Sequence, residues 1–141
     1  MIERPLVLAS SSPRRKDLLN QIGMNFIVVP SNVDENFNLS LPPNAFTEHW
    51  AREKAKHIAK RYPDNIVLGA DTVVILENKI LGKPKDTEES FNMLSSLSGK
   101  THEVITGLSI IYKKQNIDIT FNQKTYVSIK TLSNDKIYDY M

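Results

Sequence analysis

The segment Ser10 to Arg15 places three serines, a proline and two arginines directly behind the apolar run Pro5 to Ala9. The apolar run predicts a short buried strand. Ser12 fits the N-cap position of a following helix, and Pro13 fits its first helical position. The segment therefore predicts a strand that leads through a serine-rich turn into a helix N-terminus.

The first turn of this helix carries three cations, Arg14, Arg15 and Lys16. The helix dipole is already positive at an N-terminus, so acidic residues are preferred there. Free N–H groups, the hydroxyls of Ser10 and Ser12 and the arginine guanidinium groups together suit a phosphate. The alternative interpretation is a solvated basic turn without a ligand.

Asp71 lies inside the otherwise apolar stretch Ile66 to Leu76, in the sequence Gly69 to Thr72. A buried, ionised carboxylate is costly unless a cation, a metal or hydrogen bonds compensate it. Desolvation raises the pKa of a carboxyl group toward the range that a general base uses. The alternative is an aspartate at a strand end that caps a turn through its own backbone.

Two lysines are also placed unusually. Lys54 lies between Trp50 and Ile58 in the apolar face of a predicted helix, so its side chain must either snorkel to solvent or meet an anion. Lys83 lies in the loop Leu81 to Pro84, where a glycine and a proline restrict the backbone. A solvent-exposed surface lysine is the alternative there.

Glu35, next to Asp34, is a candidate metal ligand. Carboxylates from Glu35 and Asp71 would suit Mg²⁺ or Mn²⁺ bridging phosphates. The three histidines have no metal-binding spacing among themselves, and no Walker loop, glycine-rich dinucleotide motif or Ser-His-Asp order is present.

The composition limits the class of protein. The 141 residues suit a single domain, with 40% hydrophobic and 24% charged residues. A net charge of +2 argues against a dedicated nucleic-acid binder. The lack of cysteine excludes disulfides, thiol nucleophiles and zinc–thiolate sites. No segment resembles a signal peptide or a membrane span, so we expect a cytoplasmic protein without a membrane partner.

The hydrophobic pattern alternates strands with helices and indicates an α/β fold with a mixed sheet. Asp86 and Glu89 resemble a capping box, and Ser133 fits the N-cap of a final helix. The expected strands cover residues 5–9, 26–30, 66–76, 101–112 and 117–130, and the expected helices cover residues 13–22, 44–62 and 87–98.

Six segments taken together resemble the Maf family of septum-formation-inhibitor-like nucleoside triphosphate pyrophosphatases, in order and in spacing. The match covers nearly the whole chain. The segments are Ser10 to Arg15, Val33 to Glu35, Ala51 to Ala55, Gly69 to Val74, Leu81 to Pro84 and Ser98 to Gly107.

The resemblance implies hydrolysis of a nucleoside triphosphate between its α and β phosphates, with Mg²⁺ or Mn²⁺, in the cleansing of nucleotide pools. It also implies the elongated α/β fold of inosine-triphosphate pyrophosphatases, a mixed sheet flanked by helices, as one domain over residues 1–141. Asp71 matches the proton acceptor that activates water, and Glu35 matches an acidic residue near the metal. The expected substrate-binding residues are Ser10, Ser12, Arg14, Arg15, Lys54, Thr72 and Lys83.

Arg14 and Thr72 resemble the branch that acts on dTTP and UTP rather than on 7-methyl-GTP. Family members usually continue for roughly fifty more residues, and their total length is still typical of one domain. We therefore expect a C-terminally truncated form, and a homodimer would fit the family. The alternative function is an inactive nucleotide- or phosphate-binding protein linked to cell division or septum formation.

Overall fold

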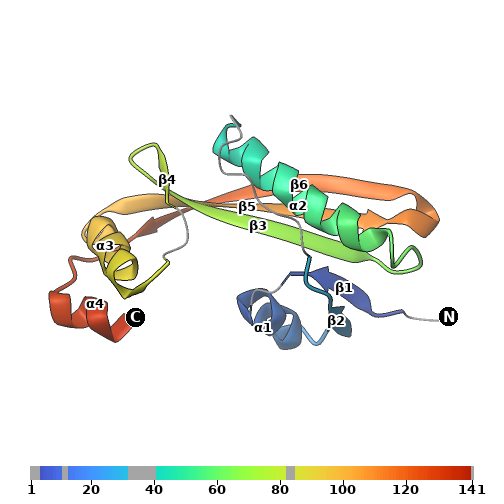
Figure 1. Cartoon of the computed structure of the whole chain (residues 1–141), viewed down its shortest axis with the longest axis horizontal. Helices are drawn as coiled ribbons and strands as arrows, with labels where there is room; N and C mark the ends of the chain where they lie inside the picture. Colours follow the sequence, from blue (N-terminus) through green and yellow to red (C-terminus); the bar gives the residue numbers. More distant parts are fainter. Residues whose placement is uncertain (1–3, 11–12, 32–40, 82–84, 141) are drawn as a thin grey trace. The chain divides into compact units, whose positions relative to one another are not determined.

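A computed structural model describes residues 4–10, 13–31, 41–81 and 85–140 of the chain (Figure 1). Strands and helices alternate at first and give way to a long hairpin followed by a short helix. In chain order the elements are β1 (Leu6–Ala9), α1 (Pro13–Gln21), β2 (Phe26–Val28), α2 (Pro43–Ala59), β3 (Val67–Leu76), β4 (Lys79–Leu81), α3 (Thr87–Leu97), β5 (Thr101–Tyr112), the 3₁₀ turn η1 (Lys113–Gln115), β6 (Ile117–Ser128) and α4 (Asn134–Tyr140).

The predicted elements are present, with local differences at their ends. Helix α2 ends at Ala59 rather than at Tyr62. The Asp86 side chain caps α3 by accepting a hydrogen bond from the Glu89 N–H at 2.8 Å, as predicted. The Glu89 carboxylate, however, accepts from the N–H of Lys85 rather than from that of Asp86.

Strand β4 is the element that the sequence did not predict. It pairs antiparallel with β3, with Leu76 opposite Lys79. Glu77 and Asn78 form the two-residue connection and have φ angles of 51° and 66°. Two successive positive φ values are typical of a type I′ hairpin turn. The three residues that follow this turn form the strand.

The strands form one mixed sheet in the order β2-β1-β3-β5-β6, with β4 paired to β3. Strand β1 is parallel to β2 and to β3, and Ala9 lies opposite Gly69. The chain therefore leaves β1 beside the part of β3 that carries Asp71.

Strands β5 and β6 form the predicted hairpin. The hydroxyl groups of Thr101 and Ser128 are 2.7 Å apart, and those of Ser109 and Thr120 are 3.0 Å apart. Both pairs fit a single antiparallel register. Asn116 closes the connection in the left-handed region, with φ 56° and ψ 41°.

The contacts divide the chain into two compact units. The first comprises Met1–Asp71 and Thr106–Gln123, and the second comprises Thr72–Ile105 and Lys124–Met141. The boundary falls within β3, β5 and β6. The expectation of a single domain over residues 1–141 stays a prediction.

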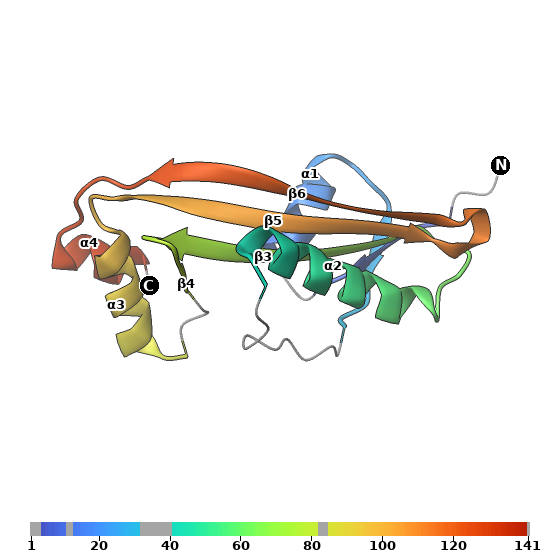
Figure 2. The same cartoon turned by 90° about the horizontal axis from the view of Figure 1, so that it is seen from above.

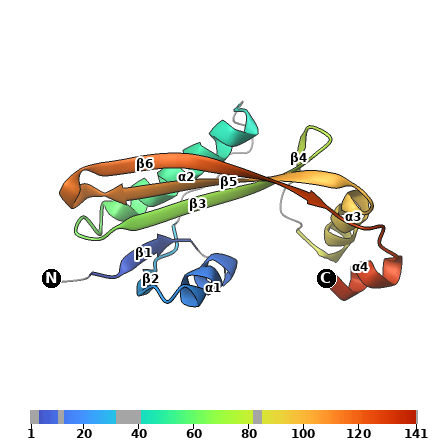
Figure 3. The ribbon, with the colours of Figure 1, turned by 180° about the vertical axis from the view of Figure 1, so that it is seen from behind.

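In the first unit, α2 covers one face of the sheet and α1 lies toward the opposite face (Figures 1 and 2). Seen from behind, β5 and β6 lie in front of α2 (Figure 3). Apolar side chains from α2, β1, β3 and β5 fill the space between the helix and the sheet. The buried cluster consists of Val7, Ala9, Ala55, Ile58, Ala59, Val67 and Ile111, with Val29 and Tyr62 packed against it.

Helix α2 approaches the sheet closely at Gly69 of β3 and Gly107 of β5. A Cβ atom on Gly69 would lie 2.8 Å from the Ala55 backbone nitrogen and would also overlap the Ala51 carbonyl oxygen. A Cβ atom on Gly107 would lie 2.7 Å from the Glu48 backbone nitrogen. Only glycine therefore allows the two backbones to approach this closely.

In the second unit, α3 and α4 contact each other through the rings of Phe91 and Tyr138, whose centroids are 5.0 Å apart. Ser133 caps α4 by accepting a hydrogen bond from the Lys136 N–H at 3.3 Å, which confirms the predicted cap. Among the described residues, none of the helices combines the length and the apolar character needed to span a bilayer.

We predict that Gly69→Ala lowers the free energy of unfolding by about 3 kcal/mol, because the added methyl group must displace helix backbone. Gly23→Ala is the control. Gly23 has a φ of 73°, and a Cβ atom added there would meet nothing within 4 Å, so the change costs only backbone strain of about 1 kcal/mol. Urea denaturation measures both, and equal losses would contradict close packing at Gly69.

Candidate active site

Asp71 lies in the middle of β3 rather than at a strand end. Its side chain is 7% exposed and points to the same side of the strand as Gly69, the side that α2 covers. The interpretation of Asp71 as a turn-capping aspartate is therefore wrong. The carboxylate is instead held between the sheet and the helix.

Lys54 meets an anion rather than extending to solvent. Its Nζ atom lies 3.1 Å from Oδ1 of Asp71 and 3.4 Å from the carbonyl oxygen of Ala70. The lysine side chain is 19% exposed. The ammonium group compensates the desolvation of the carboxylate and favours its ionised form. Two residues that the sequence singled out separately thus form one buried ion pair.

Ser10 is the third predicted site residue in this region. It is 8% exposed and follows Ala9, the register partner of Gly69. The end of β1 and the start of the connection to α1 therefore lie beside the segment of β3 that leads to Asp71. Parallel strands commonly form sites at such carboxyl ends.

The structure describes the other predicted substrate- and metal-binding residues only in part. Arg15 is partly buried in the first turn of α1, where no acidic residue is present. Arg14 belongs to the same helix turn, but its side chain lies outside the description. Thr72 is exposed and points to the opposite side of β3 from Asp71. Ser12, Glu35 and Lys83 lie outside the described residues.

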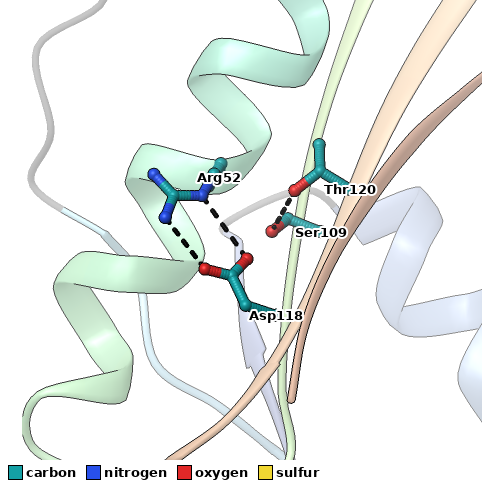
Figure 4. A network of polar contacts seen from close by, with 4 residues as sticks. All are labelled: Arg52, Ser109, Asp118 and Thr120. Atoms are coloured by element: carbon teal, nitrogen blue, oxygen red, sulfur yellow. Dashed lines mark hydrogen bonds and ion pairs between the residues drawn. The ribbon is translucent and has the colours of Figure 1, made fainter. Parts of the chain in front are cut away.

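The sequence did not identify the polar contacts that join α2 to β6. The Arg52 guanidinium donates to both carboxylate oxygens of Asp118, at 2.8 and 3.4 Å (Figure 4). This hydrogen-bonded pairing raises the pKa of Arg52 above its usual value. Asn122 donates to Glu48 at 2.9 Å. Sequence patterns carry no signal for these pairs, because the partners are far apart in the chain.

The sheet contacts of α2 also depend on Gly107, to which the sequence patterns assigned no role of its own. A glycine inside a buried strand can mark a close backbone approach. That signal was available at both Gly69 and Gly107.

The family model described as "Maf-like protein" matches residues 5–141. The chain belongs to the Maf family.

Several curated members of the Maf family are similar over nearly the whole chain. The dTTP/UTP pyrophosphatase of Ruminiclostridium cellulolyticum is 45% identical over 139 residues, which are 98% of this chain and 72% of the relative. The dTTP/UTP pyrophosphatase of Desulforamulus reducens is 44% identical over 138 residues, with the same coverage of 98% and 72%.

A solved structure shares the fold of this Maf protein. The HAM1 protein from Coxiella burnetii superposes with a TM-score of 0.61 at 17% identity, over 89% of this chain and 73% of that one. The predicted α/β fold with a mixed sheet is confirmed.

We predict that Lys54→Met lowers the free energy of unfolding by about 3 kcal/mol, because it removes one partner of a buried ion pair. The double variant Lys54→Met with Asp71→Asn regains at least about 1 kcal/mol of this loss, since the buried charge is then gone.

A double-mutant cycle in urea measures this coupling. The matched control is the exposed pair of Arg52 and Asp118, whose side chains are 43% and 44% exposed. Its coupling is expected to stay below about 1 kcal/mol. Strict additivity at Lys54 and Asp71 would contradict the inferred interaction.

Proposed function

We propose that this Maf protein hydrolyses nucleoside triphosphates, dTTP and UTP in particular, to the monophosphate and pyrophosphate. The relatives named dTTP/UTP pyrophosphatase support this substrate class through 44–45% identity over 98% of the chain. The observation that carries the proposal is the buried pair of Lys54 and Asp71 beside the end of β1.

The proposed role of Asp71 is that of a general base. A water oxygen attacks the α phosphorus, the bond from that phosphorus to the bridging oxygen breaks, and pyrophosphate leaves. Asp71 accepts the proton that the water loses. A base must be ionised before it acts, and the Lys54 ammonium favours that form.

The proposed role of Lys54 is to bind phosphate oxygens without leaving the carboxylate. An ammonium group has three donors, so a lysine can contact Asp71 and a phosphate oxygen together. Arg14, Arg15 and Lys83 would supply further cations, and Ser10, Ser12 and Thr72 would supply hydroxyl groups. A triphosphate needs fixed positive charge around its equatorial and leaving oxygens.

A divalent cation is part of the proposal. Within the described ranges, no three metal-ligating side chains gather, and Asp71 is the buried carboxylate. This donor set fits Mg²⁺ or Mn²⁺, which proteins often hold through one or two carboxylates together with substrate phosphates. Asp71 and Glu35 would hold the ion, which would neutralise phosphate charge and polarise the reacting phosphorus.

The setting that we propose is the cytoplasm, where removal of surplus or damaged triphosphates would cleanse nucleotide pools.

We predict that Asp71→Asn lowers kcat by about 10²- to 10⁴-fold, the usual contribution of a general base. The measurement is pyrophosphate release from dTTP, UTP, 7-methyl-GTP and other triphosphates with Mg²⁺ or Mn²⁺. Asp64→Asn is the matched control, because Asp64 is exposed and approaches Arg4 only to 3.9 Å. Full activity of Asp71→Asn would refute the assigned role. Triphosphate binding in calorimetry without any turnover would instead support the inactive binding protein.

We predict that a chelator abolishes pyrophosphate release and that added Mg²⁺ or Mn²⁺ restores it, since the ion neutralises phosphate charge. Unfolding monitored by circular dichroism in the same chelator is the control, and it is expected to be unchanged. Undiminished turnover in excess chelator would contradict the proposed need for a divalent cation.

A further inference from the structure

Among the residues that the structure describes, the indole N–H of Trp50 is a buried hydrogen-bond donor without an acceptor. Trp50 is 7% exposed, and its Nε1 atom has no hydrogen-bond partner there. Buried indole groups usually find a partner, because an unbonded buried donor is costly. A leucine or a phenylalanine would be buried at this position without that cost. Folding alone therefore does not explain a tryptophan here.

Two neighbouring rings hold the indole in place. The centroid of the Trp50 ring lies 4.8 Å from that of His49 and 6.4 Å from that of Phe46, and both contacts are edge-on. Phe46 is 1% exposed, whereas His49 is exposed, so the indole has one neighbour in the core and one at the surface. A donor on a ring that is already packed loses little freedom when a ligand binds to it.

Trp50 lies one helical turn from Lys54. Residues four positions apart are neighbours on the same helix face, and long helical side chains lean toward the N-terminus. The Lys54 side chain therefore extends toward the turn that carries Trp50, and its Nζ atom lies 3.1 Å from Oδ1 of Asp71. Four residues correspond to about 6 Å along the helix axis. Trp50 and the lysine of the ion pair thus occupy adjacent positions on α2.

The same turn of α2 lies against the strand that carries Asp71. The carbonyl oxygen of Ala51, the residue after Trp50, occupies the space that a Cβ atom on Gly69 would need. Gly69 and Asp71 are two residues apart on the same side of β3, a separation of about 7 Å. Trp50, Lys54 and Asp71 also belong to the same compact unit of the chain. The indole therefore borders the ion pair to which we assign the hydrolysis.

We propose that Trp50 is a substrate-binding residue whose indole N–H donates to a phosphate oxygen of the nucleoside triphosphate. This inference rests on the proposed function, because the substrate supplies the acceptor. An indole N–H can only donate, so its partner must be an acceptor such as an anionic oxygen. Lys54, one turn away, is the cation proposed to bind the same phosphate chain. The substrate would thus use a donor that the described chain leaves unbonded.

A neutral donor suits this position because Lys54 already carries a positive charge. A second cation at position 50 would repel Lys54 and compete with it for Asp71. The indole N–H adds a hydrogen bond and leaves the net charge of the ion pair unchanged. A hydrogen bond to a charged acceptor is also stronger than one between neutral groups. Trp50 would therefore strengthen phosphate binding without disturbing the carboxylate that acts as the base.

Intrinsic fluorescence tests the position of the ligand, because Trp50 is the only tryptophan of the chain. Excitation at wavelengths that tyrosine does not absorb reports on this residue alone. We expect inorganic triphosphate with Mg²⁺ to change the Trp50 emission in a saturable manner, and uridine to leave it unchanged. A change with uridine alone would assign the N–H to the base and would overturn the proposal.

Calorimetry on the same samples separates this inference from the proposed function. Binding of inorganic triphosphate that leaves the Trp50 emission unchanged would overturn the inference and leave the proposed function standing. If neither inorganic triphosphate nor UTP binds, the proposed function is refuted and the inference is refuted with it.

An isosteric replacement tests the N–H group itself. Benzothienylalanine keeps the shape of tryptophan and has sulfur in place of the N–H, and its incorporation in place of tryptophan alters residue 50 alone. We expect the Kd for inorganic triphosphate and the KM for UTP to rise about 10- to 100-fold, the effect of one hydrogen bond to a charged group. The kcat is expected to stay nearly unchanged, because the contact is made in both the bound substrate and the transition state.

Unfolding in urea distinguishes binding from a structural role. Loss of an unbonded buried donor leaves the free energy of unfolding equal or higher. A less stable protein with unchanged Kd and KM would show that Trp50 is structural and would overturn the proposal.

Trp50→Phe removes the same donor with a natural residue, and Tyr62→Phe is its matched control. Tyr62 follows the same helix, packs against the buried cluster and loses one polar hydrogen in the substitution. We expect Trp50→Phe to weaken binding of inorganic triphosphate about 10- to 100-fold. Tyr62→Phe is expected to change it by less than about twofold. Circular dichroism checks that both variants are folded, and equal affinities of the two would overturn the proposal.

Discussion

The structure of the site depends on the contact between helix α2 and the sheet at Gly69 and Gly107. Without side chains at these two positions, the helix backbone lies directly on β3 and β5. A helix at the usual distance would keep its lysine farther from the strand. The close approach instead brings Lys54 to 3.1 Å from Asp71. The lack of a side chain at Gly69 and at Gly107 therefore allows the short distance between Lys54 and Asp71.

The ion pair explains how both charges can lie largely away from solvent, with Lys54 19% and Asp71 7% exposed. An unpaired aspartate inside an apolar strand would cost several kcal/mol, and a lysine in an apolar helix face would extend outward. Each charge offsets the free-energy cost of removing the other from water. Such a pair contributes little net stability compared with an apolar pair of similar size. Its presence is therefore better explained by chemistry than by folding.

The sequence predicted most elements, because apolar periodicity and the caps at Asp86 and Ser133 are local signals. It missed β4, because three residues after a tight turn are too few to show a pattern. It also identified Asp71 and Lys54 as unusual residues. Their pairing depends on how a helix lies against a strand, which no local pattern encodes. The contacts of Arg52 with Asp118 have the same origin.

The strand order also bears on the order in which the contacts of this protein form during folding. The hairpin of β5 and β6 joins neighbouring strands through a short turn, and two hydroxyl pairs connect the strands. The parallel pairing of Val7 with Val67 must instead close a long loop that contains two helices. Loop-closure entropy makes such non-local contacts slow to form. Ser10 reaches the neighbourhood of Asp71 through that pairing. We therefore expect the site to be among the last regions of the molecule to form.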